Sequence, residues 1–148
     1  MPDKSYVDEN NKERERLSNL INRLKPEDLT HPMEAGWTVS AVLAHLAFWD
    51  LRASLLIDKW KIEGIETIPW DIDMVNDTTV PFLLAIPPRT AAELAIKFAT
   101  EIDHKIEQLP DTFVKEIEIN GKTVRLNRAN HRRGHLDDIE KVLGFRTR

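Results

Sequence analysis

The first residue whose type and position could do chemistry is His45, which interrupts an otherwise apolar run from Ala41 to Trp49. Thr38 precedes this run and is expected to cap the N-terminus of a helix. A helix that is hydrophobic nearly all round lies inside a bundle, where an imidazole costs free energy unless its ring nitrogens are satisfied. Two interpretations follow: a core histidine hydrogen-bonded to a neighbouring helix, or a metal ligand.

A second pair of histidines stands near the end of the chain. His131 and His135 are four residues apart, so on a helix they lie one above the other on a single face. Ile139 and Val142 continue that face toward the core, which puts both imidazoles where leucines would ordinarily lie. Taken alone, the pair also fits a partly exposed pair on an arginine-rich helix.

The three histidines together predict a metal site. Neutral imidazoles from two buried helix faces supply three nitrogen ligands at one depth of a helical bundle. Three protein ligands leave a position open for water or substrate, which is the pattern of a catalytic site rather than a structural one. Imidazole ligation suits zinc, nickel, copper or iron, and we expect a divalent ion, with zinc or nickel preferred.

The elements that must position these histidines follow from the spacing of apolar residues, which predicts helices over residues 3–24, 39–62, 71–84, 90–109 and 127–143. Asp71 is expected to cap the third of these helices. Thr90 and Glu93 form a capping-box signature for the fourth. Gly64 and Gly144 are natural C-terminal stops. His104 falls on the outer face of the fourth helix and is expected to be exposed.

From Phe113 to Leu126 the apolar period changes. Ile117 and Ile119 alternate with glutamates, and Asn120-Gly121 is a strong signal for a hairpin turn. The predicted fold class is therefore all-α: a single domain over residues 1–148, built as an antiparallel four-helix bundle with a small β-hairpin before the last helix.

Composition limits the class of function. The chain has 148 residues, a net charge of −4 and no cysteine, which excludes a disulfide framework and a cysteine nucleophile. Mild acidity argues against a nucleic-acid partner. The N-terminal stretch is charged and has no apolar core of the kind found in signal peptides, and no apolar run reaches the ~20 residues of a membrane span. We expect a cytoplasmic protein without a membrane partner, whose thiol chemistry, if any, uses a thiol from outside.

The stretch from Trp37 to Trp49 (WTVSAVLAHLAFW), the late HxxxH motif and the segment from Asp71 to Asp77 (DIDMVND) carry a resemblance to a known family. The chain resembles the DinB-like (YfiT-like) superfamily of four-helix-bundle proteins, which includes the metal-binding domain of mycothiol-dependent maleylpyruvate isomerase. The resemblance implies that His45, His131 and His135 form the metal triad. It also implies a homodimer and an external low-molecular-weight thiol as a cosubstrate.

Several polar side chains are placed to support such a site. Asp50 and Asp138 lie five and three residues after a histidine, so either could orient an imidazole, or both could be solvated surface carboxylates. Asn76 could line the pocket, or could equally cap or kink its own helix. Trp49 is also expected to support the site or to contact substrate.

Four arginines allow two interpretations. Arg52 and Arg128 could each bind a carboxylate of a substrate bidentately, or could form ion pairs with the protein's own glutamates. For Arg132 and Arg133 we favour the ion pair.

The sequence thus predicts a metal-dependent enzyme acting on a small molecule, as a thiol-dependent transferase or isomerase or as a hydrolase. The alternative is a non-catalytic dimeric bundle that binds metal or a small ligand. Trp60 and Trp70, near the ends of their elements, are expected to be partly exposed in a lone chain and so to favour the dimer.

Overall fold

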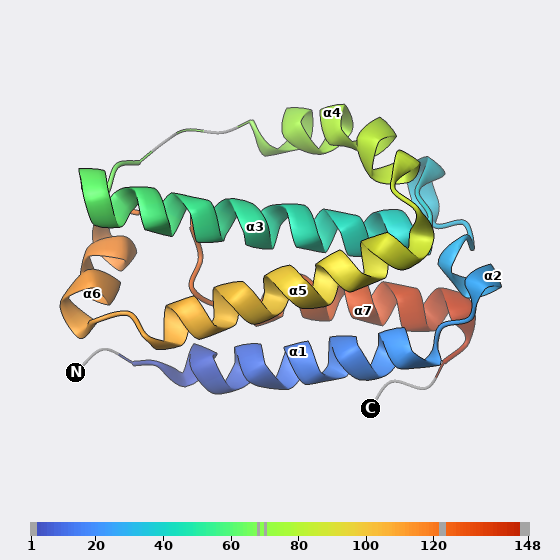
Figure 1. Cartoon of the computed structure of the whole chain (residues 1–148), viewed down its shortest axis with the longest axis horizontal. Coiled ribbons are helices and arrows are strands. Elements are labelled where there is room, and N and C mark those ends of the chain that lie inside the picture. Colours follow the sequence, from blue (N-terminus) through green and yellow to red (C-terminus); the bar gives the residue numbers. More distant parts are fainter. Residues whose placement is uncertain (1–2, 68, 70, 122–123, 146–148) are drawn as a thin grey trace.

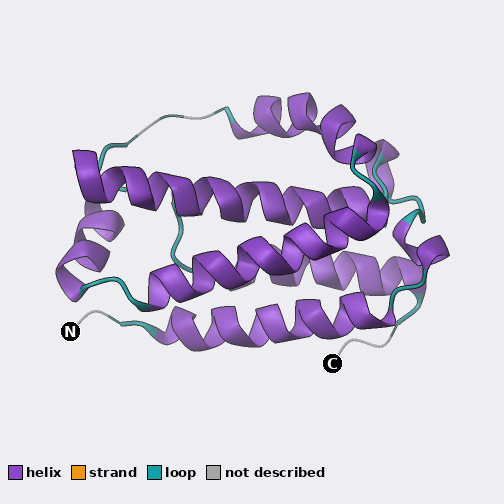
Figure 2. Ribbon diagram, viewed as in Figure 1, coloured by secondary structure: helices purple, strands orange, loops and turns teal. Residues whose placement is uncertain are grey.

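The computed structural model describes residues 3–67, 69, 71–121 and 124–145, and these residues fold into helices joined by loops (Figures 1 and 2). Apart from an isolated bridge between Pro32 and Thr38, they form no strand. The elements in chain order are α1 (Ser5–Arg23), α2 (Pro26–Leu29), the 3-10 helix η1 (Glu34–Gly36), α3 (Val39–Glu63), α4 (Ile72–Ala85), α5 (Pro88–Glu107), α6 (Asp111–Asn120) and α7 (Ala129–Leu143).

The long helices α1, α3, α5 and α7 lie side by side (Figure 1). One apolar cluster joins the end of α1, the start of α3, the start of α5 and the end of α7, and a second joins the ends of α3 and α5 to the start of α1. Helices α3 and α5 therefore run in one direction, and α1 and α7 in the other. This differs from the expected antiparallel order, because the segment containing α4 carries the chain back before α5 begins.

Helix α3 packs against α4, α5 and α7. Its N-terminus is capped as expected, since the Thr38 hydroxyl accepts a hydrogen bond from the backbone N–H of Ala41 at 3.1 Å. Gly64, with φ of 90°, ends it. By length and composition alone α3 could cross a membrane, but 67% of its most apolar window is buried against the rest of the structure. Its apolar character is that of a core helix.

The expected β-hairpin is wrong, because residues 111–120 form α6. Val114 and Ile117, three residues apart, are buried on one face of this helix, whereas Ile119 is 67% exposed. Helical burial therefore overrides the apparent alternation. Gly121 serves close packing here, because a Cβ at this position would lie 2.9 Å from the Trp60 ring. Part of the second expected strand, residues 122–123, lies outside the described residues.

Of three further helix ends expected from the sequence, two are confirmed and one is wrong. The Asp71 carboxylate caps α4 by accepting from the backbone N–H of Met74 at 3.1 Å. Gly144, with φ of 73°, ends α7. The capping box at Thr90 is wrong, since α5 already begins at Pro88, where a missing N–H costs nothing.

A buried arginine ties α7 to its neighbours. Arg132 is 1% exposed, and its two terminal nitrogens donate to the two oxygens of Asp103 on α5, each at 2.8 Å. The same guanidinium donates to Asp50 on α3 at 3.3 Å and to the backbone carbonyl of Asn10 on α1 at 3.1 Å. One polar side chain therefore joins α7 to α1, α3 and α5 at once.

Asn10 fixes the beginning of the same helix. Its side-chain oxygen accepts from the backbone N–H groups of Arg128 and Ala129 at 2.7 and 2.9 Å, and its amide donates to the Leu126 carbonyl at 2.9 Å. These N–H groups at the start of α7 have no partner within the helix, so a residue of α1 satisfies them. The loop entering α7 is thereby held against α1.

Replacing Arg132 by Met should cost about 3 kcal/mol of unfolding free energy, because the buried carboxylates of Asp103 and Asp50 each lose one of their two guanidinium partners. Urea denaturation at pH 7 measures this loss. The matched control is Arg133→Met: this neighbour is 40% exposed and pairs with Glu13 and Glu9, so its loss should cost about 1 kcal/mol or less. Equal losses for both variants would contradict the role given to Arg132.

Candidate metal centre

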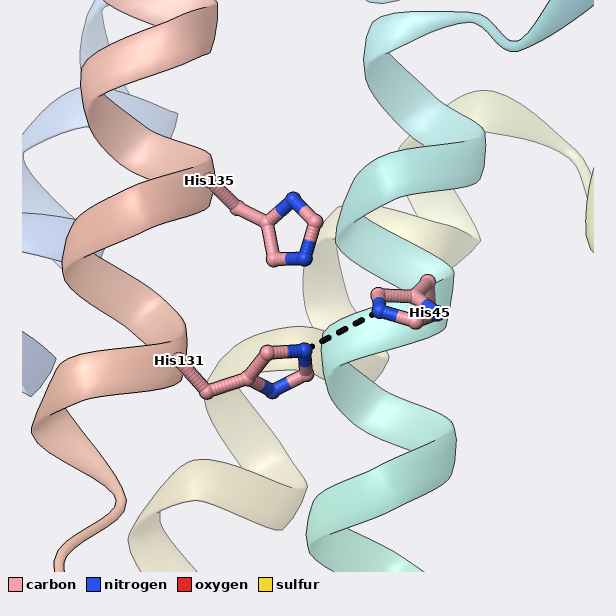
Figure 3. Close-up of side chains that lie close together, drawn as sticks. All are labelled: His45, His131 and His135. Carbon is pink, nitrogen blue, oxygen red and sulfur yellow. Dashed lines mark hydrogen bonds between the residues drawn. The ribbon is translucent and has the colours of Figure 1, made fainter. Parts of the chain in front are cut away.

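Three imidazoles converge between α3 and α7 (Figure 3). His45 extends from α3, and His131 and His135 extend toward it from successive turns of α7. The ring centroids are 5.0 Å (His45–His131), 4.8 Å (His45–His135) and 4.8 Å (His131–His135) apart, which makes a nearly equilateral triangle. One ring nitrogen from each residue lies within 4.8 Å of those from the other two.

The nitrogen positions fit a shared divalent ion. Tetrahedral zinc with Zn–N bonds near 2.05 Å needs nitrogens about 3.3 Å apart. The Nε2 atoms of His45 and His131 are 3.0 Å apart, and the whole set lies within 4.8 Å, so small ring rotations would bring all three into range. Among the described residues, Nδ1 of His45 is buried without a hydrogen-bond partner. His45 is therefore hydrogen-bonded to a neighbouring helix through Nε2, as the simpler interpretation expects, but its other ring nitrogen is left unsatisfied among the described residues.

Burial also keeps these rings in the form that binds metal. It lowers the pKa of His45 to about 4, with a smaller effect from His135. The pKa of His131 falls to about 2, through burial first and then the positive charge of His135, His45 and nearby arginines. Burial lowers the pKa of His135 as well, with Asp138 opposing the shift. At neutral pH all three rings are uncharged and have a free lone pair.

A cavity of about 700 Å³ opens beside the triad, and all three histidines line it. Of the supporting residues expected from sequence, five line the cavity: Trp49, Arg52, Asn76, Arg128 and Asp138. Sequence reasoning missed others on its wall: Met33, Glu34, Ala35, Trp37, Val42, Ile72, Arg125, Asn127 and Asn130. Arg125 fell in the expected hairpin and Asn127 at the start of the expected last helix, and no pattern in the sequence connected either residue with the site.

Asp50 does not act on an imidazole. It is 3% exposed, and its carboxylate accepts from Arg128 Nε at 3.0 Å and from Arg132 at 3.3 Å. It is therefore neither the histidine-orienting group nor the solvated carboxylate that the sequence allowed. Asp138 is exposed at the cavity edge and acts on His135 through its charge.

Two tryptophans form apolar walls near the triad. The Trp37 ring meets His45 edge-on, with centroids 5.3 Å apart at 83°. Trp49 donates its indole N–H to the Asn76 side-chain oxygen at 2.9 Å, which joins α3 to α4 across the cavity wall. The Arg52 guanidinium lies 5.6 Å from the centroid of the Trp49 ring. Asn76 thus contacts the site through Trp49, as well as lining the cavity.

The arginines divide as the sequence suggested, with one change of partner. Arg133 pairs with Glu13 at 3.3 Å, as expected. Arg132 forms ion pairs too, but with aspartates rather than glutamates. Arg128 pairs with Asp50 and also lines the cavity. The pKa of Arg52 is lowered by burial first and then by the positive charge of Arg128.

The chain belongs to the family described as the mycothiol maleylpyruvate isomerase N-terminal domain, whose model matches residues 11–116. This is a DinB-like metal-binding domain family, so the resemblance stated from the sequence is confirmed. The match includes His45 and ends before α7, so it does not reach His131 and His135. Neither the curated proteins nor the solved structures contain a match to this chain.

The metal-free protein should lose stability as the pH falls from 7 to 5. The folded-state pKa values of His45, His131 and His135 lie below the ordinary 6.5, so their contribution is present above 6.5 and is lost below it as the unfolded chain takes up protons. The loss should be on the order of 1–2 kcal/mol per histidine by pH 5.

Urea denaturation at both pH values measures this loss, and His131→Gln should reduce the pH dependence relative to the unaltered protein. His104→Gln serves as the control, since His104 is exposed on α5 and should leave the dependence unchanged. An identical pH dependence in the unaltered protein and in His131→Gln would contradict the burial of a neutral His131.

Proposed function

We propose that this protein is a metal-dependent enzyme that holds one divalent ion through His45, His131 and His135 and acts on a small molecule. The convergence of three uncharged imidazoles, one buried and two partly buried, on the wall of a 700 Å³ cavity carries the proposal. Membership of a metal-binding domain family supports it. An all-imidazole donor set suits zinc, nickel, copper or iron, and of these we propose zinc or nickel.

We further propose that the cosubstrate is an external low-molecular-weight thiol. The chain has no cysteine, and the family description carries the name of such a thiol, mycothiol. A divalent ion bound here would supply Lewis-acid activation of a thiol or water. The reaction class that fits is thiol-dependent transfer or isomerisation, with hydrolysis as the related possibility.

The chain's own residues would bind and orient the reactants. His45, His131 and His135 hold the centre, while the rings of Trp37 and Trp49 exclude water from one side of it. Asp138, close enough to His135 to act on its pKa, is a carboxylate at the cavity edge that can accept a proton. Because Trp49 is hydrogen-bonded to Asn76, its ring is fixed as a rigid wall.

The alternative is a non-catalytic module that sequesters metal or a small ligand. A purely structural site is closed by four protein ligands, whereas this triad faces a cavity large enough for a substrate. The catalytic interpretation therefore has the stronger support. Exchange of a bound water for an added thiol distinguishes the two interpretations, since only an open site permits it.

Protein purified without a metal-affinity column should contain one divalent ion per chain by elemental analysis. His45→Ala should reduce the occupancy by more than tenfold while circular dichroism still reports a folded helical protein. His104→Ala, on the exposed face of α5, should retain full occupancy. Full metal content in His45→Ala, or no divalent ion bound by the unaltered protein at neutral pH, would end the proposal.

We also propose that the protein forms a homodimer through the exposed apolar side chains of α3. Leu55 is 59% exposed and Ile62 is 86% exposed, and the two lie seven residues apart on one face of the helix. Exposed apolar groups in such a stripe favour association. Trp60 contributes nothing to this surface, because it is only 2% exposed, and Trp70 lies outside the described residues.

Light scattering at micromolar concentration should therefore give the mass of a dimer. The double variant Leu55→Glu, Ile62→Glu should give the mass of a monomer. The control is Ile119→Glu on α6, an apolar side chain that is 67% exposed and should leave the dimer intact. A monomer mass for the unaltered protein would refute the dimer.

A further inference from the structure

The cavity beside the triad is charged differently at its two ends. Along α7 the cavity-lining residues Arg128, His131, His135 and Asp138 follow one another at intervals of three, four and three, so they form a single stripe on one helix face. The stripe therefore has a cation at its beginning, the two histidines in the middle and a carboxylate at its end.

On the opposite wall, formed by η1 and α3, the charged residues follow the chain in the reverse order, with the carboxylate first and the cation last. Glu34 in η1 precedes α3, and Arg52 follows His45 by seven residues, with all three lining the cavity. Because α3 and α7 are antiparallel, this order places Arg52 at the Arg128 end and Glu34 at the Asp138 end. Arg125, in the loop that leads to Arg128, adds a third guanidinium at the first end.

The charges at the arginine end of the cavity produce the stronger electrostatic field of the two ends. Arg128 is only 8% exposed and pairs with Asp50, and in the ion-pair network that it joins three guanidinium groups, those of Arg14, Arg128 and Arg132, share the two carboxylates of Asp50 and Asp103. At the other end Glu34 and Asp138 are both exposed, where water and salt weaken the field of their charges. The cavity therefore carries an excess of positive charge on one side of the triad, in partly desolvated surroundings.

We propose that the cavity takes a ligand bearing an acid group, which binds at Arg52 and Arg125 while the reacting part of the ligand lies against the histidines. Guanidinium groups bind such oxyanions bidentately. Along the helix axes Arg128 is about 4.5 Å from His131 and Arg52 about 10 Å from His45, and the long arginine side chains can cover part of these distances, so a short ligand can join the two places. This inference rests on the proposed function, whose substrate class it names.

Three thiols of equal length test the proposal on zinc-loaded protein: 3-mercaptopropionate, its amide 3-mercaptopropionamide, and the amine 3-aminopropane-1-thiol. Titration calorimetry should show the acid binding at least tenfold more tightly than the amide, and the amine should bind no more tightly than the amide. Equal affinity for the acid and the amide would overturn the proposal.

Variants assign the effect to the arginine end. The double variant Arg52→Gln, Arg125→Gln should bring the affinity for the acid down to that of the amide, with the affinity for the amide unchanged. The single variant Arg125→Gln changes an exposed side chain, so it tests the assignment without disturbing the core. It should lower the affinity for the acid at least threefold. Lys61→Gln controls for net charge, because Lys61 is an exposed cation on α3 outside the cavity. It should change neither the affinity for the acid nor the affinity for the amide. A full acid preference in the double variant would overturn the assignment.

A metal-free arm separates this inference from the proposed function. Glutarate and its diamide are titrated into metal-free protein, with the fluorescence of the cavity-lining Trp37 and Trp49 as the readout. Tighter binding of glutarate supports the acid subsite even if no metal or thiol binds, in which case the metal-dependent function alone fails. Equal binding of the two overturns the subsite, even if metal and thiol bind as proposed.

Discussion

The buried ion pair between Arg132 and Asp103 is the interaction on which the rest of the site depends. A guanidinium that is 1% exposed is stable only while carboxylates and a carbonyl surround it, so it tolerates one position of α7 against its neighbours. Its neighbour in sequence, His131, lies about 100° further round the helix and points toward His45. Holding Arg132 in the core therefore also holds His131, and with it His135 one turn later, opposite α3.

The helices were predictable because their signals are local. Thr38 caps α3 and Asp71 caps α4 through their own side chains, and both are evident from sequence alone. The region of Asn120-Gly121 was not predictable in this way. Gly121 is needed because the Trp60 ring packs closely against it, a contact between residues far apart in the chain. In the sequence, a glycine required for close packing looks the same as a glycine required for a hairpin turn. The parallel direction of α3 and α5 likewise depends on where α4 packs.

The histidines of the candidate site were identified from sequence because a histidine in an apolar run, or at core-facing helix positions, is chemically conspicuous. The role of Asp50 was not identified from sequence, because its partners Arg128 and Arg132 lie 78 and 82 positions further along the chain. Arg125 went unrecognised for a related reason: its loop reaches the cavity only because Asn10 holds the start of α7. Long-range polar contacts, rather than local patterns, complete the site.

The central claim is that three imidazoles of one chain share one divalent ion. X-ray absorption at the zinc edge of the zinc-loaded protein tests this most directly, because imidazole rings give a distinctive multiple-scattering pattern. The account predicts three imidazole nitrogens at about 2.0–2.1 Å and one further oxygen ligand that a thiol sulfur at about 2.3 Å replaces. Bound zinc with one imidazole or none would contradict it.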